Sequence, residues 1–157
     1  MVNFKIEDYG NTYICKAKEE HIKQIAPYMR KIDLLEVACM GVSPEESMLN
    51  SLRNDDYTFT VCNKEDVPFA MFGVGDASYC PYIWFLSTDE IYTHRKQFLK
   101  VTKTWLSRFN EIYPVVCNFV HKDNEFAIRW LKWCGAKFIN KRTFKEEEFI
   151  EFIITGK

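Results

Sequence analysis

The chain has 157 residues, is 47% hydrophobic and 16% aromatic, and carries a formal net charge of −1. This composition excludes a disordered chain and is sufficient for an independent core. No apolar run reaches the roughly 18 residues that a membrane-spanning helix needs, and the first ten residues lack the basic and apolar regions of a secretion signal. The near-zero charge provides no overall field for nucleic acid, so we expect no nucleic-acid partner, although a local basic patch stays open.

Cysteine and histidine are spaced unlike the ligands of a metal site. The six cysteines lie singly in apolar segments, with no CxxC pair, and the three histidines are far apart. We therefore expect no metal ion. Without an export signal, buried free thiols in a reducing cytosol are the better interpretation than three disulfides.

The first half of the chain predicts one strand, three helices and three further strands. Ser43 begins the third helix as an N-cap, with Pro44 at the first helical position and Glu46 completing a capping box. Gly41 is the expected stop of the second helix. The elements run over Thr12–Ala17 (strand), Glu19–Arg30, Ile32–Met40 and the segment from Ser43 (helices), and Tyr57–Asn63, Pro68–Val74 and Tyr82–Leu86 (strands).

A long amphipathic helix opens the second half and ends at Pro114. Its apolar stripe includes Trp105 and Phe109, which we expect to be core residues together with Leu131 of the next helix, the two helices covering opposite faces of the sheet. Val115–Val120 is the next predicted strand, and the last two strands, Phe138–Phe144 and Phe149–Ile154, pair across an acidic turn.

The segment from Asn118 to Phe138 carries the most specific pattern. A helix that Asp123 or Asn124 can cap follows an apolar strand, and Gly135 stops the helix before a new strand begins. Asn-x-x-Ala-Ile-x-Trp-Leu followed by Gly resembles the acceptor-side motif of the GCN5-related N-acetyltransferase (GNAT) superfamily. The resemblance implies a single α/β (α+β) domain over residues 1–157, with a mixed central sheet flanked by helices. It also implies that the strands Tyr82–Leu86 and Val115–Val120 are parallel neighbours that splay apart.

Longer stretches resemble a tailed-phage branch of this superfamily, including proteins described as internal virion protein A. The shared stretches are Met29-Arg30-x-x-Asp33-x-x-Glu36, the helix start after Gly41, Phe69–Val74, Trp84–Asp89 and Asn118–Trp133. This resemblance implies a phage accessory or virion-associated protein, located in the host cytoplasm or the virion, with a phage or host protein as partner.

The superfamily binds acetyl-CoA, and the resemblance places its cofactor-binding positions at Leu86, Ser87, Thr88, Asp89, Arg95 and Asn124. Two departures disfavour acetyl transfer. The glycine-rich loop that cradles the pyrophosphate is replaced by Ser87–Gln97, which has no glycine and contains Asp89 and Glu90. Leu131 stands where the family often has the tyrosine that protonates the leaving thiolate, and a leucine cannot donate a proton. Tyr92 or Tyr113 could substitute for it. The alternative function is an active acetyl-CoA-dependent N-acetyltransferase acting on an amine.

Three groups of residues have both a functional and a structural interpretation. Asp33 and Glu36 lie one helical turn apart near Arg30, and they are either the catalytic carboxylates that deprotonate an amine or a solvated ion-pair cluster. The segment Trp84–Asp89 either meets a ligand at the end of its strand or only caps the turn into the next helix. Trp130 and Trp133 could stack on a base or a partner, but we expect one in the core and the other exposed. If the first two groups form one site, Arg30, Asp33, Glu36, Thr88 and Asp89 should converge.

Overall fold

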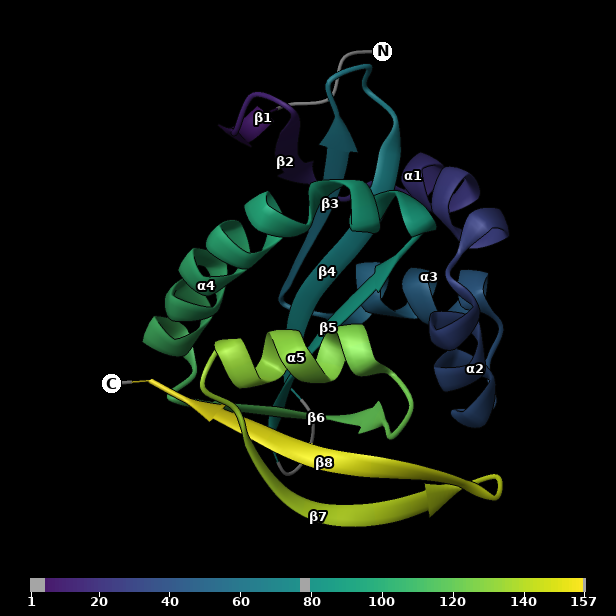
Figure 1. Ribbon diagram of the computed structural model, residues 1–157. Coiled ribbons are helices and arrows are strands. Elements are labelled where there is room, and N and C mark those ends of the chain that lie inside the picture. Colours follow the sequence, from purple (N-terminus) through teal and green to yellow (C-terminus); the bar gives the residue numbers. More distant parts are fainter. Residues whose placement is uncertain (1–4, 77–79, 157) are drawn as a thin grey trace. The chain divides into compact units, whose positions relative to one another are not determined.

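The computed structural model describes residues 5–76 and 80–156 (Figure 1). Residues 1–4, on which the expected lack of a secretion signal partly rests, lie outside the described residues. The chain forms two compact units, Met1–Gly75 with Trp84–Thr93, and Asp76–Ile83 with His94–Lys157. It passes from one unit to the other after Gly75, within strand β5 (Pro81–Ser87) and again after Thr93.

The first unit combines antiparallel strands with three helices. Strands β1 to β4 pair in sequence order, each antiparallel to the next. Strand β1 was not predicted, because its four residues, KIED, show no apolar alternation. The strands are β1 (Lys5–Asp8), β2 (Thr12–Lys16), β3 (Tyr57–Asn63) and β4 (Pro68–Asp76), and the helices are α1 (Glu19–Ile25), α2 (Lys31–Cys39) and α3 (Pro44–Asn54).

The helix boundaries in this unit follow local chemistry. Ser43 caps α3 as predicted, because its Oγ accepts the Glu46 N–H at 3.2 Å. Gly41 follows α2 with φ of 81°. The helix predicted over Glu19–Arg30 instead ends at Ile25 and continues as the 3₁₀ segment η1 (Ala26–Tyr28). Pro27 has no N–H to donate, so the α-helical hydrogen bonds stop there.

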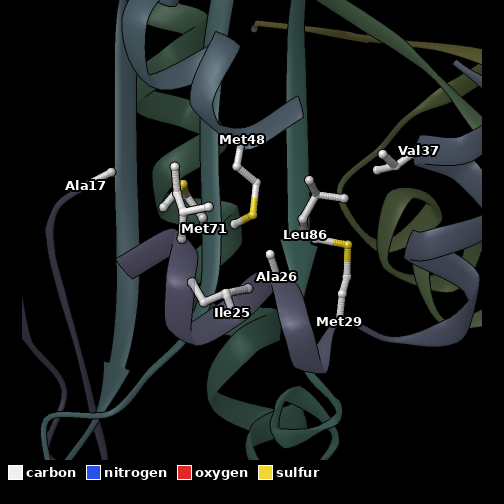
Figure 2. Close-up of a cluster of buried hydrophobic side chains, with 9 residues drawn as sticks. Ala17, Ile25, Ala26, Met29, Val37, Met48, Met71 and Leu86 are labelled. Carbon is white, nitrogen blue, oxygen red and sulfur yellow. The ribbon is translucent and has the colours of Figure 1, made fainter. Parts of the chain in front are cut away.

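A cluster of apolar side chains holds the helices of the first unit on the strands. Methionines from three elements, Met29, Met48 and Met71, lie among these side chains in Figure 2. Their flexible, unbranched chains can fill the irregular space between helices and sheet. The cluster consists of Ala17, Ile22, Ile25, Ala26, Met29, Val37, Met48, Met71 and Leu86. Since Met29 and Leu86 share it, the cluster fixes the end of β5 beside the segment that leads into α2.

The second unit is a mixed sheet with two helices. Its strands are ordered β5-β6-β8-β7; β5 and β6 are parallel, with Tyr82 opposite Cys117, and the other pairs are antiparallel. The predicted parallel neighbours are therefore confirmed. One residue further along, a side chain joins the two strands, because Asn118 Nδ2 donates to the Ile83 carbonyl at 2.6 Å. The elements are β6 (Val115–His121), β7 (Lys137–Phe144), β8 (Glu147–Thr155), α4 (Arg95–Ile112) and α5 (Glu125–Trp133).

Helices α4 and α5 pack directly on each other (Figure 1). The Phe98 ring lies 5.5 Å from the Phe126 ring and 5.4 Å from the Trp130 ring, and Trp130 Nε1 donates to Thr102 Oγ1 at 2.8 Å. The expectation that the two helices cover opposite faces of the sheet is therefore wrong. Each apolar stripe could be identified from the sequence, but the face it covers depends on this aromatic contact between the helices.

The predicted core residues of the second unit are buried. Trp105, Phe109 and Leu131 are 6%, 5% and 1% exposed. Trp133 is 51% exposed, which confirms one half of the expectation for the two tryptophans. Trp130 packs against α4 but is only half-buried, so it is not a full core residue. All six cysteines are free thiols, four of them buried. None of the described helices combines the length and the apolarity that crossing a membrane requires.

Candidate functional site

The end of β5 is joined to the segment that precedes α2. Arg30 N–H donates to the Ser87 carbonyl at 2.9 Å, and Met29 forms an antiparallel bridge with Thr88. Met29 and Arg30 have extended backbone (ψ of 144° and 145°), which lets them run beside the strand end. This pairing brings α2, with its candidate carboxylates, to the last residues of β5.

Arg30 and Asp33 form a buried two-point ion pair. Arg30 Nη2 donates to Asp33 Oδ1 at 2.6 Å and Nε donates to Oδ2 at 3.0 Å. The two side chains are only 4% and 1% exposed. Asp33 Oδ2 also accepts the Ser87 N–H at 3.0 Å. The convergence expected for Arg30, Asp33 and the Ser87–Asp89 backbone is confirmed. The alternative of a solvated ion-pair cluster is wrong for these two residues, because the pair is buried where the Asp33 carboxylate binds the last backbone N–H of β5.

A tyrosine completes this arrangement. Arg30 Nη1 donates to the Tyr92 hydroxyl at 3.1 Å, and the guanidinium lies 5.7 Å from the centre of the Tyr92 ring. Tyr92 itself is 36% exposed, so this contact lies at the surface although the ion pair is buried. Tyr92 is one of the two tyrosines that could replace the missing general acid, and its hydroxyl is already bound to a cation.

Burial affects both charges of the pair, and it prevails only for Asp33. It raises the pKa of the Asp33 carboxyl above its ordinary value, a rise that the bonds from Arg30 and from the Ser87 N–H oppose and the nearby Asp89 carboxylate increases. Burial opposes the charge of Arg30 as well, but the bonds to Asp33 and Tyr92 still raise its pKa. A carboxylate that accepts three hydrogen bonds from a guanidinium and a backbone N–H has most of its acceptor sites occupied. Asp33 is therefore poorly placed to take a proton from an amine.

The other candidate carboxylate and the Ser87 hydroxyl have different surroundings. Glu36 lies one helical turn after Asp33 and is half-buried; its convergence on the strand end stays a prediction.

The Ser87 side chain is 0% exposed, and within the described residues its Oγ is the buried side-chain polar atom without a hydrogen-bond partner. An unsatisfied buried hydroxyl is costly, so it needs an explanation.

The segment that replaces the glycine-rich loop is a 3₁₀ helix, η2 (Asp89–His94). The backbone N–H groups just before η2 and in its first turn donate to other groups of the chain. The Thr88 N–H donates to the Phe69 carbonyl at 2.8 Å, and the Ile91 N–H donates to the Thr88 carbonyl at 3.3 Å. The Glu90 N–H donates to Thr88 Oγ1 at 3.3 Å. Together with the Ser87 N–H, which donates to Asp33, four backbone amides in or beside this segment donate within the chain. Asp89 is exposed at the start of this helix, where its charge would repel an anion.

Arg95 and Asn124 belong to the second unit. Arg95 is exposed at the start of α4, with its guanidinium 5.9 Å from the centre of the Phe126 ring. Asn124 is 3% exposed, and its Oδ1 caps α5 by accepting the Ala127 N–H at 3.2 Å. The sequence had left the cap to Asp123 or Asn124. Leu131, at the position of the family's tyrosine, is a core residue.

Cys134 is a poor nucleophile in these surroundings. Burial raises the pKa of its thiol to about 11, although Lys103 and Thr102 act in the opposite direction. A thiol with this pKa is almost wholly protonated at neutral pH.

A hydrogen bond between Trp84 and Asp55 was not predicted from the sequence. Trp84 Nε1 donates to Asp55 Oδ2 at 2.8 Å beside Gly73, where a Cβ atom would lie 2.4 Å from the Tyr57 carbonyl oxygen. A glycine inside the apolar strand Phe69–Val74 was the available signal, since such glycines often mark a close approach of backbone.

A family model matches residues 59–143, just over half of the chain, and is described as "Bacteriophage T7, probable scaffold protein Gp13". The chain belongs to this family. No curated protein sequence matches the chain. The family membership agrees with the phage link expected from the sequence.

Several solved structures similar to this family member are described as acetyltransferases. A GNAT-family acetyltransferase from Bacillus anthracis has 12% identity and a TM-score of 0.68, with 99% of this chain and 98% of that chain covered. The ribosomal-protein-S5-alanine acetyltransferase from Vibrio fischeri has 13% identity and a TM-score of 0.66, covering 100% and 98%. A putative GNAT-family acetyltransferase from Bordetella pertussis has 9% identity and a TM-score of 0.70, covering 97% and 100%. The chain therefore has the GNAT fold, and identities this low carry only the fold.

Proposed function

We propose that this protein is a tailed-phage accessory or virion-associated protein that acts by binding another phage or host protein, with acetyl transfer weakened or lost. Membership of a family described as phage scaffold proteins supports the phage role. The internal virion protein A branch is the specific relative that we propose, with the host cytoplasm or the virion as location.

The observation that carries the loss of acetyl transfer is the occupation of the strand end by the protein's own groups. Asp33 is bonded to Arg30 and to the Ser87 N–H, and the Thr88, Glu90 and Ile91 amides donate within the chain. A bound diphosphate would have to displace several of these hydrogen bonds. Asp89 adds repulsion on the order of 1–4 kcal/mol per charge at close range. These residues do not fit the cofactor of the fold family.

The alternative is an active acetyl-CoA-dependent N-acetyltransferase acting on an amine of a protein or small molecule. One observation favours it, namely the unpartnered buried hydroxyl of Ser87, one of the positions that the family resemblance assigns to the cofactor. A ligand that accepts or donates one hydrogen bond there would satisfy the hydroxyl. Asp33 or Glu36 is the residue that we would assign to amine deprotonation in that case.

Calorimetric titration with acetyl-CoA at moderate salt separates the two functions. We expect a Kd above about 100 µM, which is weaker than roughly −5.5 kcal/mol. An active acetyltransferase titrated under the same conditions is the positive control. Low-micromolar binding would overturn the proposal and favour the enzyme. The phage role is tested separately by mass spectrometry of purified particles and of complexes captured during assembly, and absence from both would remove it.

A further inference from the structure

The near-neutral net charge of the chain conceals a strong asymmetry. The first unit contains 8 Lys and Arg against 14 Asp and Glu, a formal charge of −6, whereas the second contains 13 against 8, a charge of +5. Such asymmetry within one chain is a signal for interaction with a charged polymer. The basic surplus of the second unit is concentrated on its two helices, since α4 and α5 together hold seven Lys and Arg and two Asp and Glu.

Helical spacing gathers these cations into two adjacent stripes. On α4, Lys96, Lys100 and Lys103 follow one another at i, i+4 and i+7, and all three are exposed. A rise of about 1.5 Å per residue spreads them over about 10 Å of helix axis. On α5, Arg129 and Lys132 share a face with Trp133, and all three are exposed. We call these six residues the α4–α5 basic surface.

One contact joins the two stripes. Lys103 Nζ lies 4.3 Å from the centre of the Trp133 ring, in a cation–π contact. Trp133 is 51% exposed, so one part of the indole remains accessible beside the lysines. In the described part of the chain, no ion pair engages the charged groups of the five basic residues. The acidic residues on the two helices are Glu125, one turn before Arg129, and Glu111, two turns after Lys103.

We propose that the α4–α5 basic surface binds single-stranded nucleic acid without sequence preference. Cations in a row neutralise backbone phosphates, and an exposed indole provides a platform on which any base can stack. An acidic protein segment would use the cations but has no need of the exposed ring. This inference does not depend on the proposed protein-binding role. It differs from the expectation of no nucleic-acid partner, which was based on net charge alone and left a local basic patch open.

The test measures fluorescence anisotropy of labelled oligo(dT) with the whole chain over a range of salt concentrations. Lys100→Gln/Lys103→Gln should weaken binding at least tenfold at low salt and reduce the slope of log affinity against log salt by about 1.4, since each phosphate contact on a single strand contributes about 0.7. The matched control is Lys137→Gln/Lys141→Gln, which removes the same charge from exposed positions of β7 in the same unit. Equal losses in both variants would overturn the proposal.

Trp133 gives a second, independent readout. Trp133→Ala should weaken oligo(dT) binding by about fivefold to 100-fold, whereas Trp133→Phe should keep most of the affinity and lose the fluorescence quenching that accompanies binding. Circular dichroism melts should match the parent, because the side chain is half exposed. No effect of Trp133→Ala, or equally tight binding of poly-L-glutamate, would overturn the proposal in favour of a general polyanion surface.

Discussion

The Arg30 guanidinium and the Asp33 carboxylate meet at two points, 2.6 and 3.0 Å apart, at a place where almost no solvent reaches either side chain. A buried pair of this kind does not guarantee stability, because removing two charges from water offsets much of their attraction. Each charge of the pair does depend on the other, because removal of either side chain would leave its partner buried and unpaired. The bond from the Ser87 N–H extends this dependence to the end of β5.

Asp33→Ala should therefore lower the free energy of unfolding by about 3–5 kcal/mol, because it leaves the Arg30 charge buried and unpaired. Arg30→Met/Asp33→Leu is the matched variant, since it removes both charges while keeping the volume, and it should recover much of the loss. Urea unfolding of the three proteins measures the difference. If Asp33→Ala melts like the parent and only a partner or phage phenotype is lost, Asp33 is a functional residue and not a structural one.

The outcome at Asp33 illustrates what the sequence could predict. The spacing Arg30-x-x-Asp33 left two alternatives, a solvated ion-pair cluster and a pair of catalytic carboxylates. The burial of the Arg30–Asp33 pair depends on Ser87, which is 54 residues away from Asp33 in the chain. Capping at Ser43 and the buried Trp105 followed from local pattern, whereas the parallel strands β5 and β6 followed from the family resemblance. The packing of α4 on α5 followed from neither, because aromatic contacts between distant segments decide it.

Gly73→Ala should destabilise the first unit by about 1–3 kcal/mol, as overpacking of a close contact does. A Cβ atom at this position would lie 2.4 Å from the Tyr57 carbonyl oxygen and 3.1 Å from Trp84 Nε1. Thermal melts of Gly73→Ala with and without Trp84→Phe identify the decisive contact. The backbone contact predicts no rescue by Trp84→Phe, and a full rescue would assign the strain to the indole instead.

His21 should make the protein less stable in mild acid. The side chain is 1% exposed, its Nδ1 accepts the Lys18 N–H at 3.1 Å, and Thr60 Oγ1 lies 2.8 Å from the same atom. Burial lowers the pKa of His21 below its ordinary value, with Lys18 acting in the same direction and Glu20 against it. The unfolded chain then binds more protons than the folded one. The stabilisation is therefore complete above the unfolded pKa, near 6.5, and is lost as pH falls toward the folded value.

The measurement for His21 is the free energy of unfolding between pH 7.5 and pH 5, where one proton contributes at most about 1.4 kcal/mol per pH unit. His21→Asn is the matched variant, because an amide oxygen can accept the same N–H and does not titrate. The variant should show a shallower pH dependence than the parent. Parallel curves for the two proteins would mean that His21 does not titrate in this range.

Ser87→Ala distinguishes a structural hydroxyl from a ligand-binding one. Because Ser87 Oγ is buried and, within the described residues, unpartnered, its removal should leave stability unchanged or raise it by up to about 1 kcal/mol. Thr60→Val is the matched control: it removes a buried hydroxyl that does have a partner, His21, and should cost about 1–2 kcal/mol. Melts with and without acetyl-CoA complete the test. If the parent is stabilised by the cofactor and Ser87→Ala is not, the hydroxyl binds it and the protein is closer to a working acetyltransferase than we propose.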